Sequence, residues 1–265
     1  MAAKGRTGTS KTRRMFYPGL DTVGRHYLVQ EQDADGYPTG NARQYTVATT
    51  MEPALYEAYT SALANPASGT DGLKKAIEAS RDKSDEITLC IKNYDVGGLS
   101  NAIHSRHNLS IFNVSGPMGR PLAINLNGLN IAFVAGTGVL PLMDLVGFVT
   151  RSTLQLSDID SSAAALGKGF KLAMCARFRD NEAIGDKLMS ALTKANESQF
   201  MYQRGQWTAS QIEEKIASIS QKAGGAEVSN IYVCGPPKMN QEFEERLRDL
   251  QASGKISNVT QLHIL

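Results

Sequence analysis

Apolar and polar residues alternate along this chain in two different ways, and the change falls near residue 126. Between residues 25 and 126 the apolar runs are short, rich in β-branched and aromatic residues, and bounded by turn residues, which is the pattern of strands. The predicted strands there are HYLVQEQ (26–32), RQYTVATT (43–50), EITLCIKNY (86–94) and LSIFNVSG (109–116). This first region is therefore expected to be mainly β-sheet.

A helical stretch interrupts these strands. The segments EPALYEAYTSA (52–62) and GLKKAIEA (72–79) carry Ala, Leu and Glu at helical spacing. Between them lies NPASGTDG (65–72), whose Asn, Pro and Gly residues are typical of a turn. We expect two helices separated by a turn, which together form an insert near residues 51–86.

From residue 127 onward, strand and helix patterns alternate. The predicted strands are NIAFVAG (130–136), FKLAMCARF (170–178), SQFMYQR (198–204), NIYVCGP (230–236) and TQLHIL (260–265). The predicted helices cover 139–151, 181–196, 209–223 and 237–252, with Thr208 or Ser210 as a cap of the third. Five strands alternating with helices predict a doubly wound parallel sheet. The domains are accordingly expected at 25–126 and 127–265.

Composition narrows the function classes. Hydrophobic residues make up 42% of the 265 residues, enough for sizeable cores, and the net charge of +2 does not itself suggest a nucleic-acid or membrane partner. The three cysteines lack CxxC spacing, so we expect no disulfide framework and no metal site. This usage favours a reducing intracellular compartment, with cytoplasmic or cytoskeletal localisation preferred and an organelle as the alternative.

The first 24 residues form a separate basic segment. Residues 1–14 (MAAKGRTGTSKTRR) hold five basic side chains and no acidic one. Such a segment is a solvated tail, a transit peptide without a clear apolar face, or an arm that docks on an acidic surface. Our working hypothesis is an arm that docks on an acidic protein surface or larger complex, with nucleic acid as a less favoured partner.

Two strand ends carry candidate chemistry. In VAGTGVLPLM (134–143) a buried strand ends in a Gly-Thr-Gly turn, and the helix that follows offers free N–H groups and its positive dipole end to a phosphate. In YVCGPPKM (232–239) another buried strand ends in Cys and Gly, and two prolines take the chain out of the sheet. Ligands bind at this carboxyl edge in open α/β sheets, although glycine also serves turns for steric reasons alone.

These two turns resemble the nucleotide domain of the ferredoxin–NADP reductase superfamily, and within it the sequence is most similar to cytochrome b5 reductases. The resemblance implies nucleotide contacts at Gly136, Thr137, Gly138 and Pro141, and nicotinamide contacts at Cys234, Gly235, Pro236 and Met239. It also places the adenosine ribose near ARFRD (176–180). There Arg177 or Arg179 could meet a 2′-phosphate, Asp180 or Glu182 could hold ribose hydroxyls, or the loop is simply solvated.

The first domain resembles the flavin-binding barrel of the same superfamily. The motif RQYT (43–46) implies that Arg43 binds the flavin pyrophosphate, that Tyr45 stacks on the isoalloxazine, and that the Thr46 hydroxyl lies near the reactive nitrogen. The segments IKNY (91–94), GGLS (97–100) and SGPMG (115–119) match later barrel motifs, and imply FAD contacts at Lys92, Tyr94, Gly97, Gly98 and Ser100. In GGLS the hydroxyl comes one position early. Thr46 and Cys234 are the residues expected nearest the reacting atoms.

Two departures from the family pattern bear on function. Residues 15–42 have room for one strand before Arg43, so an incomplete barrel is expected, and the helical insert replaces a short loop. The first hypothesis is a flavoprotein oxidoreductase that passes hydride from NAD(P)H to FAD and electrons to an unknown acceptor. The alternative is a reductase-like fold with reduced or no activity, serving as a structural subunit of a large assembly such as a microtubule or ciliary complex.

Overall fold

A computed structural model describes most of the chain. The described residues are 19–33, 35–40, 42–82, 87–92, 98–106, 111–156, 161–179 and 183–265. The basic segment 1–14 and the predicted site residues Tyr94 and Gly97 lie outside them, as do Asp180 and Glu182.

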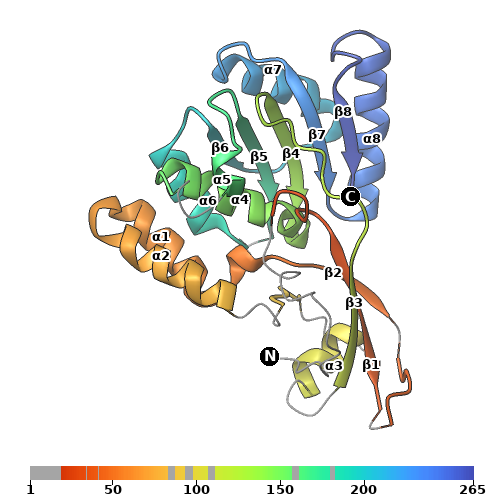
Figure 1. The fold of residues 1–265 in the computed structure, drawn as a ribbon. Helices are drawn as coiled ribbons and strands as arrows, with labels where there is room; N and C mark the ends of the chain where they lie inside the picture. Colours follow the sequence, from red (N-terminus) through yellow and green to blue (C-terminus); the bar gives the residue numbers. More distant parts are fainter. Residues whose placement is uncertain are drawn as a thin grey trace. The chain divides into compact units, whose positions relative to one another are not determined.

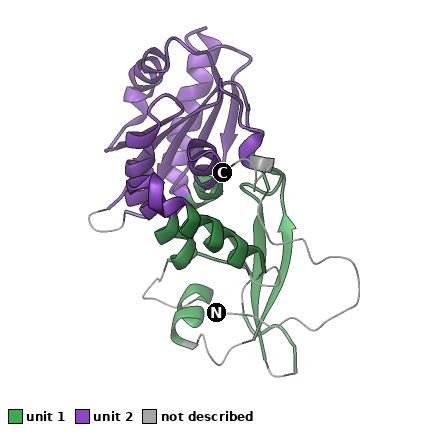
Figure 2. Cartoon of the chain, turned by 60° about the vertical axis from the view of Figure 1, so that its left-hand side comes forward, with its two compact units in different colours: residues 1–58, 71–122, 140–144 green, residues 59–70, 123–139, 145–265 purple. Residues whose placement is uncertain are grey.

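The chain divides into two compact units (Figure 2). Unit 1 comprises residues 1–58, 71–122 and 140–144, and unit 2 comprises residues 59–70, 123–139 and 145–265. Helices α1 (Pro53–Ala64) and α4 (Leu140–Thr153) contribute residues to both units. The first turns of α4 therefore belong with the strands of unit 1.

Unit 1 holds a three-stranded antiparallel sheet in the order β2-β1-β3. Its strands are β1 (His26–Gln32), β2 (Arg43–Thr46) and β3 (Ile111–Met118), which confirms three of the four strand predictions for this region (Figure 1). Tyr27 and Val29 are buried on one face of β1. The turn after β1 is ordered by Asp33, whose Oδ1 accepts the N–H groups of Asp35 and Tyr37 at 3.0 and 2.8 Å.

The fourth predicted strand is wrong within the part that the structure describes. Residues 87–92 form only an isolated antiparallel bridge, from Leu89 to Val47. The Ala48 N–H donates to the Thr88 carbonyl at 3.2 Å, but the next residues enter a 3-10 helix, η1 (Thr49–Met51). Because the segment after Val47 leaves the extended conformation at η1, it offers residues 87–92 no further backbone hydrogen bonds of the strand type.

The insert is also more helical than its sequence indicates. Helix α2 runs from Pro66 to Asp82, so the predicted turn is the start of a helix. Proline is well tolerated at a first helical position because its missing N–H would have no partner there. Gly69 lies against α1: a Cβ at this position would come within 2.6 Å of the Ala62 Cα. The glycine therefore serves close helix packing rather than chain reversal.

Unit 2 holds the predicted five-stranded parallel sheet, in the order β6-β5-β4-β7-β8 (Figure 1). The strands are β4 (Leu129–Ala135), β5 (Lys171–Arg177), β6 (Phe200–Arg204), β7 (Val228–Cys234) and β8 (Gln261–Ile264). From β4, the chain adds β5 and then β6 on one side of the sheet. It then returns to the other side of β4 and adds β7 and β8 there. The strand order therefore reverses between the adjacent strands β4 and β7, where ligands bind in such sheets.

Helices cover both faces of this sheet. In the described residues, the remaining helical elements are α3 (Leu99–Arg106), η2 (Gly136–Val139), α5 (Ser161–Ala164), α6 (Asp186–Ala195), η3 (Ala209–Gln211), α7 (Ile212–Lys222) and α8 (Pro237–Ala252). Right-handed crossovers place α4 and α6 on one face and α7 and α8 on the other. On the latter face, Phe133 of β4 meets Phe243 of α8 edge to face, with ring centroids 5.7 Å apart.

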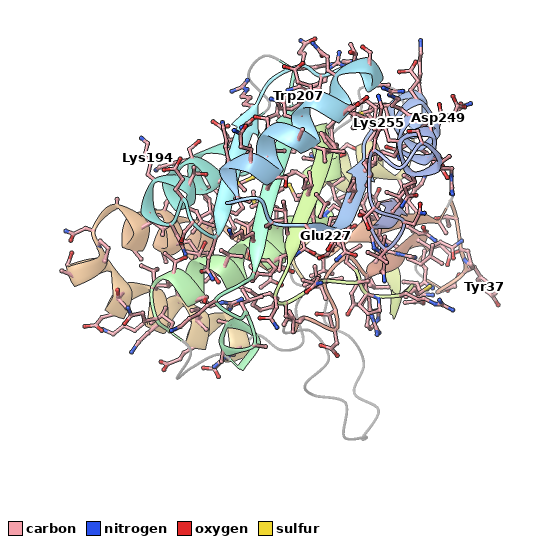
Figure 3. All side chains as sticks on the ribbon, turned by 90° about the horizontal axis from the view of Figure 1, so that it is seen from above. Tyr37, Lys194, Trp207, Glu227, Asp249 and Lys255 are labelled. Carbon is pink, nitrogen blue, oxygen red and sulfur yellow. The ribbon has the colours of Figure 1, made fainter. Side chains whose placement is uncertain are left out.

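Local signals fix helix α7. The Thr208 N–H donates to the Gln211 Oε1 at 3.1 Å, which confirms Thr208 as a cap. Glu213 then accepts ion pairs from Arg246 and Lys255, at 2.9 and 2.7 Å, and joins α7 to α8 and its following turn. Lys255 and Trp207 are labelled in Figure 3, on the α8 and α7 sides of this unit.

A network of polar side chains links β4 and β7 toward their amino-terminal ends. Asn230 Nδ2 donates to Asn130 Oδ1 at 2.8 Å, and Asn130 Nδ2 donates to the Asn125 carbonyl at 2.9 Å. The Tyr232 hydroxyl donates to the Ala123 carbonyl. These bonds hold the segment entering β4 and lie away from the carboxyl edge.

Among the described residues, no helix is long and apolar enough to cross a bilayer.

The two glycines of α2 provide a matched test of the insert packing. We expect Gly69→Ala to lower the free energy of unfolding by about 1–3 kcal/mol, because the new methyl meets the α1 backbone. Gly72 lies in the same helix with open space at its Cβ, so Gly72→Ala should raise it by about 1 kcal/mol through helix propensity alone. Urea unfolding measures both, and equal effects of the two substitutions would contradict the packing.

Candidate functional site

The candidate site of unit 2 begins where β4 ends. Gly136 comes directly after Ala135, and its backbone has a φ angle of +55°. The 3-10 turn Gly136–Val139 then continues directly into α4. Pro141 is in the first turn of α4, as predicted from the sequence. The backbone N–H groups at such a helix start have no intrahelical acceptor, so this turn can receive an anion.

The end of β7 packs directly against this turn. A Cβ at Gly138 would lie 2.0 Å from the Cys234 carbonyl oxygen and 3.2 Å from its Sγ, so only glycine allows this approach. Gly235 is similarly enclosed, with its Cβ position 2.8 Å from the Met239 Sδ and 3.1 Å from the Ala135 Cβ. Both predicted turns therefore meet at the carboxyl edge of adjacent strands.

The backbone of Gly136 is uncovered on its Cβ side at the same edge. Among the described residues other than Gly136 and its two chain neighbours, no heavy atom lies within 4 Å of the Cβ position at Gly136, whereas Gly138 two residues later is tightly enclosed. The turn thus presents open backbone next to a fixed wall formed by Cys234. This arrangement fits a dinucleotide pyrophosphate, which needs close backbone approach and N–H donors rather than side chains.

The Cys234 side chain is half-buried beside this turn. Burial raises the pKa of its thiol to about 11. At neutral pH the thiol therefore stays protonated, and its chemistry is that of a small neutral contact group rather than of a nucleophile.

Three arginines lie near the carboxyl ends of β5 and β6. Arg177 ends β5 and Arg179 follows two residues later, and both side chains are exposed. Arg204 ends β6 beside them: the next N–H, of Gly205, donates to the Ala176 carbonyl at 3.1 Å. Its guanidinium lies 5.8 Å from the Phe178 ring centroid. Arg204 is not among the site residues expected from the sequence, although its place at the end of a predicted strand was the available signal.

In unit 1 the predicted flavin residues lie on β2. The register pairs Arg43 with Val29, Tyr45 with Tyr27 and Thr46 with His26. Because successive side chains of a strand alternate, Arg43 and Tyr45 share the face that carries Tyr27, and Thr46 lies on the opposite face. Arg43 is exposed, and Tyr45 and Thr46 are half-buried.

The other described flavin candidates lie on two further segments. Lys92 is half-buried on the segment whose Leu89 bridges to Val47, directly beyond β2. Gly98 has φ +85°, and no described residue other than its chain neighbours lies within 4 Å of its Cβ position. Its carbonyl accepts the Ala102 N–H at 3.1 Å and so caps α3. Ser100 is the second residue of that helix. Open backbone at a helix start fits a phosphate group here as well.

Asp144 is a further residue that no sequence signal indicates. This residue is buried in the second turn of α4, and its Oδ1 accepts the Thr50 N–H at 2.8 Å. No motif pointed to it, because the Thr50 N–H that it accepts lies 94 positions away.

Within the described residues, no group of three or more His, Cys, Asp or Glu side chains could hold a metal ion.

Comparison with models of known protein families and with curated proteins found no match. Solved structures do match. The cytochrome b5 reductase-type domains of human Ncb5or in the NAD⁺ form superpose with TM-score 0.54 and 15% identity, over 91% of this chain and 60% of that one. Our chain therefore spans less than two thirds of the human chain.

Two further structures cover most of both chains. Ferredoxin–NADP⁺ reductase from Plasmodium falciparum with 2′P-AMP has TM-score 0.53 and 11% identity over 96% of this chain and 85% of that one. The FAD/NAD-binding domain of nitric oxide dioxygenase from Vibrio cholerae has TM-score 0.50 and 12% identity over 93% and 86%. The chain thus shares the fold of these structures, in which an antiparallel sheet is followed by a parallel sheet flanked by helices.

Proposed function

We propose that the chain is a flavoprotein oxidoreductase that binds FAD and NAD(P)H. The observation that carries the proposal is the close packing of Gly138 on Cys234 beside the open Gly136. This pairing forms a wall and a phosphate cradle at the point where the strand order reverses. Structural neighbours described as NAD⁺, 2′P-AMP and FAD/NAD-binding proteins support the same assignment.

The residues divide by the group that each would hold. The nucleotide would be held by Gly136, Thr137, Gly138, Pro141, Arg177, Gly235, Pro236 and Met239, and FAD by Arg43, Tyr45, Thr46, Lys92, Tyr94, Gly97, Gly98 and Ser100. When bound, these cofactors supply hydride transfer and electron transfer, which amino acid side chains cannot provide. The electrons would then pass to a separate acceptor molecule.

The side chains nearest the chemistry would act by orientation. The Thr46 hydroxyl can donate one hydrogen bond from β2 to the flavin. Cys234, kept neutral by burial, would contact the nicotinamide without forming a bond to it. The alternative role in a large assembly would use the basic segment 1–14 and the helical insert near residues 51–86 as docking elements, and it stays a prediction.

The exposed arginines favour NADPH over NADH. Arg177 and Arg204 present two guanidinium groups at neighbouring strand ends. Guanidinium groups bind phosphate in a bidentate way, and only NADPH carries a 2′-phosphate.

Purified protein should absorb visible light as a flavoprotein and oxidise NAD(P)H with ferricyanide as acceptor. Gly138→Ala should retain the flavin spectrum and lose most NAD(P)H oxidation, because the new methyl collides with the Cys234 carbonyl. Spectroscopy and steady-state kinetics measure both. Absence of a flavin band together with no NAD(P)H oxidation on adding FAD would sink the proposal.

Substitution of Arg177 tests the nucleotide preference. We expect Arg177→Ala to raise KM for NADPH about tenfold, the loss of one hydrogen bond between charged groups, and to leave KM for NADH nearly unchanged. Arg248→Ala is the matched control, since this exposed arginine pairs with Glu244 on α8 at 2.6 Å. Equal effects of Arg177→Ala on both nucleotides would contradict a 2′-phosphate contact.

A further inference from the structure

The buried bond between Asp144 and Thr50 joins two candidate cofactor-binding elements. Asp144 is 4% exposed and Thr50 is 2% exposed, and the N–H donates to the Oδ1 at 2.8 Å. Asp144 follows Pro141 by three residues on α4, and Thr50 follows Thr46 by four residues beyond β2. A side chain on the phosphate-binding helix thus holds the backbone that continues the flavin strand.

The Thr50 side of this bond is firmly placed. Thr50 is the central residue of η1, where the Met51 N–H donates to the Ala48 carbonyl at 2.9 Å and the Glu52 N–H donates to the Thr49 carbonyl at 2.9 Å. The Ala48 N–H in turn donates to Thr88 at 3.2 Å. Asp144 therefore binds a rigid turn rather than a free loop.

The Asp144 side acts on the start of α4. A helix is stiff over a few turns, so fixing Asp144 also fixes Leu140 and the N–H groups of the Gly136–Val139 turn, which continues into the helix. Consistent with this anchoring, residues 140–144 group with β2 in unit 1, whereas the rest of α4 groups with unit 2.

We propose that Asp144 is a positioning residue for nucleotide binding. It acts through the Thr50 N–H, and holds the first turns of α4 in the orientation that presents the Gly136–Val139 turn to the pyrophosphate. The insert begins at this point, so the bond ties the segment that departs most from the family pattern to the nucleotide site. The inference rests on the proposed function, because it presupposes that the turn binds NAD(P)H.

Two variants of the full chain separate positioning from stability. Asp144→Ala removes the acceptor, and Asp144→Asn keeps an amide oxygen that can accept the same N–H. NADP⁺ and NAD⁺ are titrated into each protein by calorimetry, and the tighter-binding one for the parent is followed. We expect Asp144→Ala to raise its Kd about tenfold, with Asp144→Asn close to the parent.

Thr150→Ala is the control on the same helix. Thr150 is fully buried, and its hydroxyl donates to the Val146 carbonyl at 2.9 Å, within α4 alone. This variant should lower the melting temperature and leave Kd unchanged. An Asp144→Ala protein that melts lower but binds like the parent would overturn the positioning role. A parent that binds neither nucleotide would overturn the proposed function as well.

Amide hydrogen exchange gives a second readout that needs no substitution. If Asp144 links the two elements, binding of the same tighter-binding nucleotide to the parent should slow exchange at the Thr50 amide more than at Val29 of β1, which is buried in the same unit. Equal slowing at both positions would overturn the proposal, even if Asp144→Ala does not fold.

Discussion

Contact between Gly138 and the Cys234 carbonyl constrains the whole parallel unit. The β4 turn can pass this close to the end of β7 only because one residue lacks a side chain. That approach sets where α4 begins, since the turn continues into the helix without a break. It also leaves Gly136 as the open part of the edge. Hence a single steric requirement determines both the wall and the opening of the candidate site.

The parallel unit could be predicted from sequence because its signals are local. Each central strand contains a run of apolar residues, and the helices carry their own periodicity, with a local cap at Thr208 and Gln211. Arg204 could have been found by the same reasoning, since it ends a predicted strand. Asp144 could not, because its role depends on a backbone N–H of Thr50, and nothing in the sequence around either residue indicates the other.

The antiparallel unit was harder to predict for a physical reason. A strand needs a neighbour, and the segment around Leu89 loses its neighbour when the chain turns into η1 after Val47. Gly69 led to the opposite error, because a turn was predicted where the chain forms helix α2. Glycine usually marks a turn, but here it is selected by the α1 backbone that packs against it. In both cases tertiary contacts decided a conformation that local preference left open.

The neutral state of Cys234 has a consequence for oxidative damage. Peroxide and disulfides react with thiolates far faster than with thiols, and a thiol whose pKa is about 11 is almost wholly protonated in the cell. In the proposed flavoprotein, a Cys234 thiolate beside the cofactors would be readily oxidised to a sulfenic acid. If the chain binds flavin as proposed, burial against the glycine turn would therefore protect the edge of β7 from the oxidants that a flavin can release.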